Sequence, residues 1–143
     1  MNDIAKDIAK TPAPVLGMYD APMWESIRAG GMTLQCCREC RVFQYPPAPV
    51  CHACLSSELD WTPVGGEGEI LSWVVYHRQY LPAYPAPYNV ISVRLKEGPV
   101  LVSNLEGSVP EGSWIGRKVR LRYAEMPDGF VLPRFALDAP GAP

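Results

Sequence analysis

Long apolar runs are missing from this sequence: no stretch holds the roughly 18 consecutive apolar residues that predict a membrane-spanning helix. The N-terminal residues MNDIAKDIAK mix charges with single isoleucines and lack the apolar region of a secretory signal, so we expect a cytoplasmic protein. Positive charge is also scarce, because charged residues make up 20% of the chain and the net charge is −2. Proteins that mainly bind nucleic acid usually have a basic surface, since phosphate neutralisation supplies most non-specific affinity. The charge balance therefore argues against that class.

Catalytic signatures are missing as well. The sequence has no G-x-S-x-G elbow, P-loop, H-E-x-x-H motif or G-x-G-x-x-G fingerprint. Of the two histidines, only His77 is a candidate general base, and no carboxylate pairing can be read from the sequence. A stand-alone thioesterase or acyltransferase would have to use His77 or Cys36 without an oriented nucleophile–base pair. We therefore expect no catalytic residues in this chain.

Cysteine, by contrast, is present in a metal-ligand pattern. Two C-x-x-C pairs separated by ten residues supply four thiolates, the number that completes a tetrahedral structural zinc site. The expected zinc ligands are Cys37, Cys40, Cys51 and Cys54. Without secretion the thiols stay reduced, which favours a metal over the alternative of disulfide bonds. Such a closed site organises the fold and activates no substrate; Cys36 is left as a spare or alternate ligand and His52 as a bystander.

Proline and glycine are abundant: sixteen prolines and twelve glycines predict a chain of strands and loops with few long helices. One helix is expected within residues 20–31, after an arm at residues 1–17. Asp20 is its candidate N-cap, Pro22 suits the first turn, and Gly30 is a natural C-terminal stop. Three apolar residues share one face of this helix, namely Met23, Trp24 and Ile27. They either cover the core or bind a partner protein.

Strands dominate from residue 59 onward. Alternating or continuous apolar segments with β-branched and aromatic residues predict six strands, which turns with glycine or proline separate. They cover residues 59–64, 68–77, 88–96, 100–105, 118–125 and 130–137. Five or six short strands predict a small closed barrel, and the OB-fold is the common five-stranded form. The expected organisation of this mainly β chain is an arm and helix (1–31), a zinc ribbon (32–58) and an OB-fold domain (59–143).

The connection between the second and third of these strands is unusually long. Routine hairpin connections have about two to five residues, whereas this one runs from Tyr76 to Tyr88 with four tyrosines and three prolines. Long aromatic loops on a rigid barrel are where binding usually resides. The candidate binding residues are Tyr76, His77, Arg78, Tyr80, Tyr84 and Tyr88. The alternative is a flap that packs its own aromatic side chains over one end of the barrel.

Short motifs in a fixed order run through most of the chain. They are Pro22-Met-Trp-Glu25 with Arg28-Ala-Gly-Gly31, Leu34-Gln35 before the cysteine motif, Tyr45-Pro-Pro-Ala-Pro-Val-Cys51, Trp61 through Gly66-x-Gly68, Ile70-x-Ser72-Trp73, Pro87-Tyr88 with Val90-Ile-Ser-Val93, Ile115-Gly116-x-x-Val119, and Pro133-Arg-Phe135. In this combination, residues 20–138 resemble the DUF35 family. The resemblance implies an N-terminal helix, a rubredoxin-like zinc ribbon and a C-terminal OB-fold barrel of five to six strands.

The resemblance also implies a function. Members of the family are commonly small partners of thiolase-fold enzymes that act on acyl-CoA, and the thiolase-like chain supplies the nucleophile and the general base. This chain would accordingly be a non-catalytic subunit of a thiolase, aldolase or acyltransferase complex, in which it stabilises the partner and helps to form the acyl-CoA channel. The aromatic loop would flank that channel, with Arg78 contacting a phosphate, while Trp24 and the ribbon would contact the partner.

Two further features of the sequence bear on this interpretation. Zinc knuckles often have a glycine after their second cysteine, where Arg41 and Leu55 stand in this chain; this departure bears on knuckle geometry and metal affinity, and zinc is still expected because all four thiolates are present. Zinc ribbons and OB-folds also bind nucleic acid, which is the alternative function. Its contacts would be the basic residues Lys96, Arg117, Lys118, Arg120 and Arg122. The simpler interpretation of these residues is a solvated outer face of the barrel.

Overall fold

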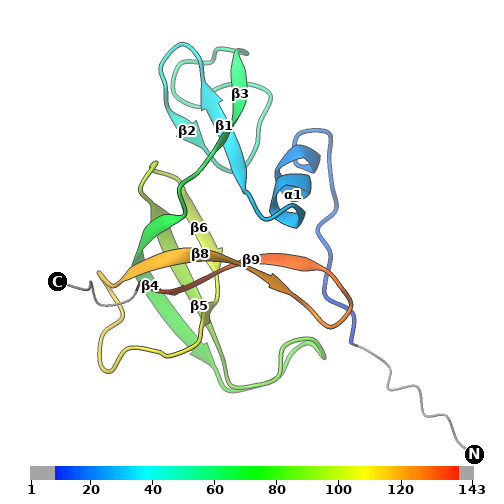
Figure 1. Ribbon diagram of the computed structural model, residues 1–143, viewed down its shortest axis with the longest axis vertical. Helices are drawn as coiled ribbons and strands as arrows, with labels where there is room; N and C mark the ends of the chain where they lie inside the picture. Colours follow the sequence, from blue (N-terminus) through cyan, green and yellow to red (C-terminus); the bar gives the residue numbers. More distant parts are fainter. Residues whose placement is uncertain (1–8, 139–143) are drawn as a thin grey trace, which may run out of the picture.

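The computed structural model describes residues 9–138 and is mainly β, as the sequence predicts. A small three-stranded sheet stands above a six-stranded one, and the single helix of the described residues lies beside the junction (Figure 1). The helix and the small sheet consist of α1 (Ala21–Arg28), β1 (Thr33–Cys37), β2 (Phe43–Gln44) and β3 (Leu59–Pro63). The large sheet consists of β4 (Glu67–Tyr76), β5 (Tyr88–Leu95), β6 (Val100–Ser103), β7 (Leu105–Glu106), β8 (Lys118–Glu125) and β9 (Val131–Leu137).

Helix α1 begins and ends where the sequence predicts, but its N-cap side chain does not cap it. Gly30 has a φ of 78°, and the N–H groups of Gly30 and Gly31 donate to carbonyls of the last turn, an arrangement known as the Schellman motif. Asp20 occupies the N-cap position, yet its side chain caps no helical N–H. Its carboxylate instead accepts a hydrogen bond of 3.3 Å from the N–H of Gly17. The predicted capping role of Asp20 is therefore wrong, because its carboxylate bonds to the preceding turn.

The small sheet has the strand order β2-β1-β3 and carries the cysteine motif. Strand β3 pairs with β1 along its whole length, from Thr33 opposite Pro63 to Cys37 opposite Leu59. The strand pattern of residues 59–64 predicts a barrel strand, but β3 belongs to the small sheet of the ribbon. Its alternating pattern predicts a strand in either sheet, because periodicity shows which face is buried and not which strand is the neighbour.

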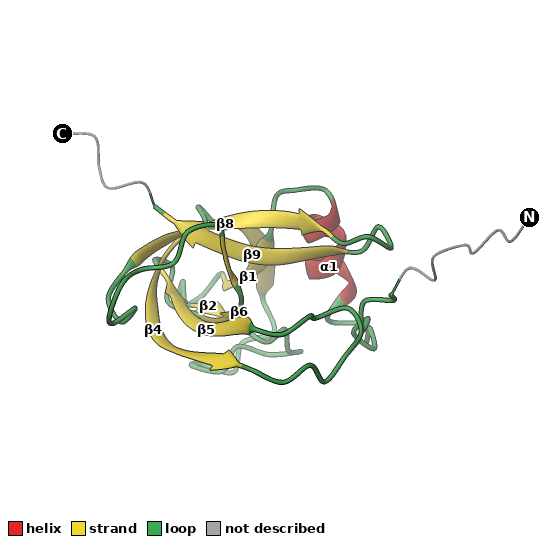
Figure 2. Ribbon diagram, turned by 90° about the horizontal axis from the view of Figure 1, so that it is seen from below, coloured by secondary structure: helices red, strands yellow, loops and turns green. Residues whose placement is uncertain are grey.

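The large sheet closes into a barrel through a strand that changes partners midway. Its order is β6-β5-β4-β8-β9-β7, and only Asn104 separates β6 from β7. β6 pairs with β5 at one end of the sheet, and β7 pairs in parallel with β9 at the other. The carbonyl of Asn104 accepts a hydrogen bond of 3.0 Å from the N–H of Phe135 across the closure. Counted as one strand, β6 and β7 make a five-stranded closed barrel of the OB type, whose strands curve around a common interior (Figure 2).

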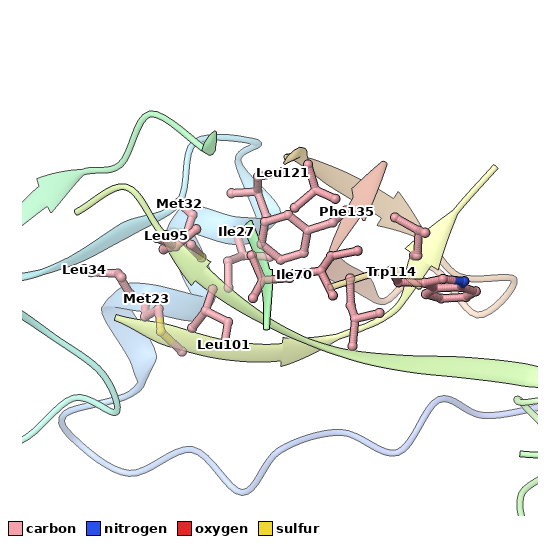
Figure 3. Close-up of a cluster of buried hydrophobic side chains, with 14 residues drawn as sticks. Met23, Ile27, Met32, Leu34, Ile70, Leu95, Leu101, Trp114, Leu121 and Phe135 are labelled. Atoms are coloured by element: carbon pink, nitrogen blue, oxygen red, sulfur yellow. The ribbon is translucent and has the colours of Figure 1, made fainter. Parts of the chain in front are cut away.

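The core of the barrel extends into the helix and the base of the ribbon. Phe135 is completely buried at its centre, and Met23 and Ile27 of α1 are only 4% and 1% exposed (Figure 3). These two helix residues therefore cover the core, so only Trp24 of the three remains available for the predicted partner contact. Met32 and Leu34 join the same cluster from the ribbon side. The helix, the ribbon base and the barrel therefore share one apolar core. Each fully buried side chain of this size contributes about 1.5–3 kcal/mol to stability.

The described part of the N-terminal arm, which begins at residue 9, is hydrogen-bonded to the turn between β8 and β9. The N–H and hydroxyl of Thr11 donate hydrogen bonds of 2.7 and 2.9 Å to the carboxylate of Asp128, in the turn between β8 and β9. Beside this contact, the ring of Trp24 packs at 5.8 Å from that of Phe130. Residues 1–8 of the predicted arm lie outside the described residues. The one helix among residues 9–138 is too short and too polar to cross a membrane.

Candidate functional site

The four predicted zinc ligands come together at the tip of the ribbon. The Sγ atoms of Cys37 and Cys54 are 3.6 Å apart, as are those of Cys40 and Cys51, and all four sulfurs lie within 4.8 Å of one another. A tetrahedron with metal–sulfur bonds of about 2.3 Å has edges of about 3.8 Å, whereas a disulfide bond measures about 2.05 Å. The four cysteines are free thiols at metal-binding spacing. The arrangement fits a tetrahedral metal site and not a pair of disulfides.

Both knuckles keep regular geometry without glycine. The N–H of Arg41 donates to the carbonyl of Cys37 and that of Leu55 to the carbonyl of Cys51, each at 2.9 Å. Arg41 and Leu55 reach these positions with φ of 64° and 63°, in the left-handed region. That conformation costs a residue other than glycine about 1–2 kcal/mol. The knuckles therefore keep the usual hydrogen bonds, and the missing glycines appear as backbone strain at Arg41 and Leu55.

Backbone N–H groups prepare two of the thiols for a metal. The N–H of Cys54 lowers the pKa of the Cys51 thiol to about 6, and the N–H of Cys40 lowers the pKa of Cys37 in the same way. These two cysteines are the buried members of the set. Because a metal binds the thiolate and not the thiol, hydrogen bonds that stabilise the anion favour metal binding. In each knuckle, the N–H of the second cysteine thus lowers the pKa of the first, so the two halves of the site are alike.

Two buried glutamines, which no sequence motif singles out, hold the connection between the two knuckles. The amide of Gln44 donates to the side-chain oxygen of Gln35 at 2.8 Å and to the carbonyl of Val50 at 3.2 Å. Gln35 exchanges hydrogen bonds of 3.0 and 2.9 Å with the backbone of Ala48. The side-chain oxygen of Gln44 accepts from the N–H of His52 at 2.9 Å. The proline-rich connection is thereby fixed to β1 and β2, and with it the position of the second knuckle.

Cys36 and His52 stand apart from the four clustered ligands. The Sγ of Cys36 lies 3.6 Å from the carbonyl oxygen of Arg41 and does not belong to the sulfur group. It directly precedes Cys37 on β1, and successive residues of a strand point to opposite faces. His52 is exposed and is engaged through its backbone N–H. Neither residue is among the grouped metal ligands of the described chain.

The predicted aromatic loop occupies residues 77–87, between β4 and β5, and its tyrosines stack on one another. Tyr76 and Tyr88 are partners across the two strands, with ring centroids 5.1 Å apart. Tyr80 packs edge-on against Tyr76 at 6.1 Å, and Tyr84 tilts against Tyr88 at 5.9 Å. The guanidinium carbon of Arg78 lies 5.5 Å from the Tyr80 ring centroid, a cation–π contact. The loop is thus a cluster of aromatic side chains that is partly exposed to solvent, because Tyr80 is still 61% exposed.

This loop curves back toward helix α1. Tyr84 and Trp24 line the same cavity of about 250 Å³, together with Tyr45 from the ribbon and Val102 from β6. A residue predicted to line a channel and one predicted to contact a partner therefore lie at one depression. His77 is exposed at the other end of the loop and does not line it. The structure thus brings part of the predicted binding set together with the helix and leaves His77 apart.

The basic residues of β8 are largely paired with acids. Lys118 contacts Glu69 at 2.7 Å, while Arg120 lies 3.6 Å from both Glu67 and Asp138. Glu67 also lies 3.4 Å from the amine of Lys96. Three of the five residues of the predicted basic stripe thus have carboxylate partners. The face is a mixed, solvated ion-pair network, which is poorly suited to neutralise phosphates along a strand of nucleic acid.

The fold and the four-cysteine site together define a protein in which a zinc-ribbon domain precedes an OB-fold barrel. Family models agree with both parts: residues 24–60 match the ChsH2 rubredoxin-like zinc ribbon domain, and residues 61–124 match the ChsH2 C-terminal OB-fold domain. A chain of the solved Ltp2-ChsH2(DUF35) aldolase has a TM-score of 0.80 and 33% identity, with 87% of this chain and 98% of that chain covered. The protein belongs to the DUF35 family, as the sequence motifs indicated.

This chain spans less than two thirds of the length of the curated relatives that it matches. A probable enoyl-CoA hydratase alpha subunit of Thermomonospora curvata is 34% identical over 130 residues, which are 91% of this chain and 41% of that protein. A DUF35 domain-containing scaffold protein of Pyrococcus furiosus is 29% identical over 80 residues, covering 54% of this chain and 57% of the scaffold. A DUF35 protein of unknown function from Sulfolobus solfataricus, at 15% identity and a TM-score of 0.61, shares the fold with 85% of this chain and 87% of its own covered.

Proposed function

We propose that this chain is a non-catalytic, DUF35-type subunit of a thiolase-fold complex that processes acyl-CoA in the cytoplasm. The observation that carries the proposal is the likeness to the DUF35 chain of the Ltp2-ChsH2(DUF35) aldolase, which extends over nearly the whole of that chain. The name of that assembly joins a DUF35 chain with an aldolase, and the Thermomonospora relative is named as an enoyl-CoA hydratase subunit. A thiolase, aldolase or acyltransferase is the expected class of partner, in a hetero-oligomer.

The metal of the ribbon is proposed to be zinc in a purely structural role. Four cysteine sulfurs at tetrahedral spacing suit Zn²⁺, and a four-thiolate set leaves no coordination position for a substrate. Two aromatic residues of the ribbon, Phe43 and Trp61, are partly buried and pack against the core cluster. This packing holds the ribbon against the barrel. Zinc would keep the shape of the ribbon fixed for contact with the partner.

The aromatic loop is proposed to form one wall of the acyl-CoA channel once the partner covers it. Tyr80 and Leu81 are 61% and 44% exposed, and large apolar groups gathered in this way usually mark an interaction surface. The depression between Tyr84 and Trp24 connects the loop to the helix side of the molecule. Arg78, at the rim of the loop, would contact a phosphate of the coenzyme.

The partner is tested by affinity purification of the tagged full-length chain from its native cells, with mass spectrometry of the co-purifying proteins. We expect a thiolase-fold protein in a fixed molar ratio that persists at high salt. Recovery of the chain alone would contradict the proposal.

The loop is tested by a replacement that the strand register permits. Because Tyr76 and Tyr88 are directly paired, residues 77–87 can be replaced by Asn-Gly, which closes a regular two-residue hairpin. We expect the variant to keep its melting transition and to bind the partner, while turnover by the complex falls at least about tenfold because the channel wall is lost. Unchanged turnover would remove the loop from the channel.

The alternative of nucleic-acid binding is tested on the isolated chain. Because the β8 face is occupied by ion pairs, we expect no detectable binding of single-stranded DNA or RNA at low salt. Binding with a steep salt dependence that is lost in Arg122→Gln and Arg117→Gln would favour the alternative instead.

A further inference from the structure

Strand β6 is an edge strand whose outer side is unpaired. It bonds to β5 on one side only, because the barrel closes through Asn104 and β7 and not through β6 itself. Its sequence, Val100-Leu-Val-Ser103, holds none of the charges, prolines or bulges with which proteins usually protect an exposed edge. Val100 and Val102 are 41% and 74% exposed. Exposed, uncharged edges of this kind pair readily with another strand.

The hydrogen-bond register shows which backbone groups of β6 point outward. The N–H of Leu95 donates to the carbonyl of Pro99 at 2.9 Å, so these two residues form a hydrogen-bonded pair. Bonded and non-bonded pairs alternate along an antiparallel ladder, and Val100 and Val102 therefore fall in the non-bonded pairs. Their N–H and C=O groups point away from β5, and no group of residues 9–138 bonds to them. β6 thus presents free donors and acceptors two residues apart.

The depression of about 250 Å³ described above adjoins this edge. Val102 lines it from β6, and Met23 and Trp24 line it from α1. Tyr45 of the ribbon and Leu132 of β9 complete these walls, and none of the residues around the cavity is acidic or basic. In β-strand addition, main-chain hydrogen bonds to an edge hold a peptide, and pockets receive its alternate side chains. The edge of β6 and the apolar cavity together supply both elements.

We propose that an extended, apolar segment of the partner subunit adds to the free edge of β6 as a further strand and places one side chain in the adjoining cavity. An extended main chain is the ligand whose N–H and C=O groups recur at the two-residue spacing of Val100 and Val102. Because no charged residue lines the cavity, that side chain is apolar. The identity of the partner as a thiolase-fold protein rests on the proposed function, whereas the open edge is a property of this chain.

The open edge is tested by amide hydrogen exchange of the ¹⁵N-labelled full-length chain. We expect the amides of Val100 and Val102 to exchange at least about tenfold faster than those of Leu101 and Ser103, which donate to β5. In the complex with the co-purified partner, the amides of Val100 and Val102 should become protected, because the added strand accepts their hydrogen bonds. Slow exchange of these two amides in the isolated chain, or unchanged exchange in the complex, would overturn the proposal.

Matched variants at position 102 separate the backbone contact from the side chain. Val102→Pro removes the outward N–H without breaking a bond to β5, and proline is tolerated in an edge strand where its nitrogen faces solvent. It should weaken partner binding at least about tenfold, since a carbonyl of the added strand is left without a donor. Val102→Thr keeps the N–H and the β-branched shape and should change the affinity less than about twofold. Equal binding by the two variants would overturn the proposal.

A third variant covers the case in which proline disturbs the barrel. If Val102→Pro lowers the melting temperature, Val102→Lys takes its place, because a lysine on a side chain that is 74% exposed blocks strand pairing without entering the core. Partner binding should again weaken at least about tenfold, while the melting temperature stays unchanged. Wild-type affinity of Val102→Lys would overturn the proposal.

A measurement without the partner distinguishes failure of this proposal from failure of the proposed function. The isolated chain selects binders from a phage-displayed library of random dodecapeptides. We expect peptides with apolar residues at alternate positions, whose binding is lost with Val102→Pro and kept with Val102→Thr. If no thiolase-fold protein co-purifies, such peptides still support the edge as a peptide site and refute only the identity of the partner. Selection of no peptide that depends on position 102 would overturn the proposal.

A second copy of this chain is the other possible occupant of the edge. Analytical ultracentrifugation of the isolated chain over a range of concentrations should show a monomer, for the wild type and for Val102→Pro alike. A concentration-dependent dimer that Val102→Pro dissolves would assign the edge to self-association and overturn the assignment to a partner subunit.

Discussion

The ribbon and the barrel bury different kinds of side chain. The barrel interior is aliphatic and aromatic, with Phe135 and Ile70 completely buried. In the ribbon beyond Leu34, the buried side chains are two thiols and two amides, namely Cys37, Cys51, Gln35 and Gln44. Apolar burial stabilises the barrel directly, whereas buried thiols and amides stabilise the ribbon only when their partners are in place. The barrel core, with the helix and ribbon-base residues packed into it, therefore rests on apolar burial, and the knuckle end of the ribbon depends on a metal and a polar network.

Metal removal should produce the largest difference in stability between the ribbon and the barrel. A structural zinc site contributes about 10–16 kcal/mol in isolated zinc-finger peptides, far more than any single contact in this chain. We expect chelation, or Cys51→Ser, to abolish hydrogen-exchange protection in the knuckles while β4, β5 and β8 stay protected. Cys36→Ser, which removes a thiol outside the sulfur group, is the control and should leave both regions unchanged. Global unfolding on chelation would show that the barrel also needs the metal.

A substitution in the barrel core should have the opposite outcome: it should destabilise the barrel and leave metal binding unchanged. Phe135→Ala leaves a cavity at the centre of the apolar cluster and should lower the free energy of unfolding by about 3–5 kcal/mol. The metal affinity of the folded variant should not change, because Phe135 touches no part of the knuckles' polar network. Denaturant unfolding and competition with a metal indicator measure the two quantities. A parallel loss of affinity would contradict the separation.

The polar network of the ribbon should have an intermediate effect. Gln44→Ala leaves the N–H of His52 and the carbonyl of Val50 without their side-chain partner, which should cost about 1–3 kcal/mol. Because these groups position the second knuckle, metal affinity should fall together with stability. Gln79→Ala in the exposed loop is the matched control. Equal behaviour of the two variants would mean that the network does not hold the metal site.

The smallest expected effect is a gain. Leu55→Gly relieves a left-handed backbone conformation that costs about 1–2 kcal/mol, against an entropic penalty for glycine of about 0.5–1 kcal/mol. The ribbon should therefore become more stable by about 0.5–1 kcal/mol, measured as slower metal release to a chelator. Ala53→Gly, at a position without positive φ in the same knuckle, should give no gain. Faster release in Leu55→Gly would contradict the assignment of strain.

The predictable parts of this fold are those that the chain encodes locally. Cysteine spacing predicts which four sulfurs gather, and Gly30 predicts the end of α1, because each depends on neighbours in the sequence. The pattern of residues 59–64 predicts a barrel strand, but β3 pairs with β1, a partner that tertiary packing determines. The closure of the barrel at Asn104 was likewise not predictable, because it rests on hydrogen bonds to distant strands.

The candidate site shows the same division. Length and aromatic content drew attention to the loop, but its proximity to Trp24 follows from how the barrel closes. Gln35 and Gln44 looked like ordinary polar strand residues, and only their burial reveals a structural role.

The most direct test of the central claim is reconstitution of acyl-CoA turnover from purified components. The co-purified thiolase-fold partner would be assayed alone, with this chain, and with the variant in which Asn-Gly replaces residues 77–87. We expect this chain alone to be inactive, the complex to turn over at least about tenfold faster than the partner alone, and the loop variant to bind without restoring that rate. Full activity of the partner alone, or turnover by the isolated chain, would contradict an accessory role for this protein.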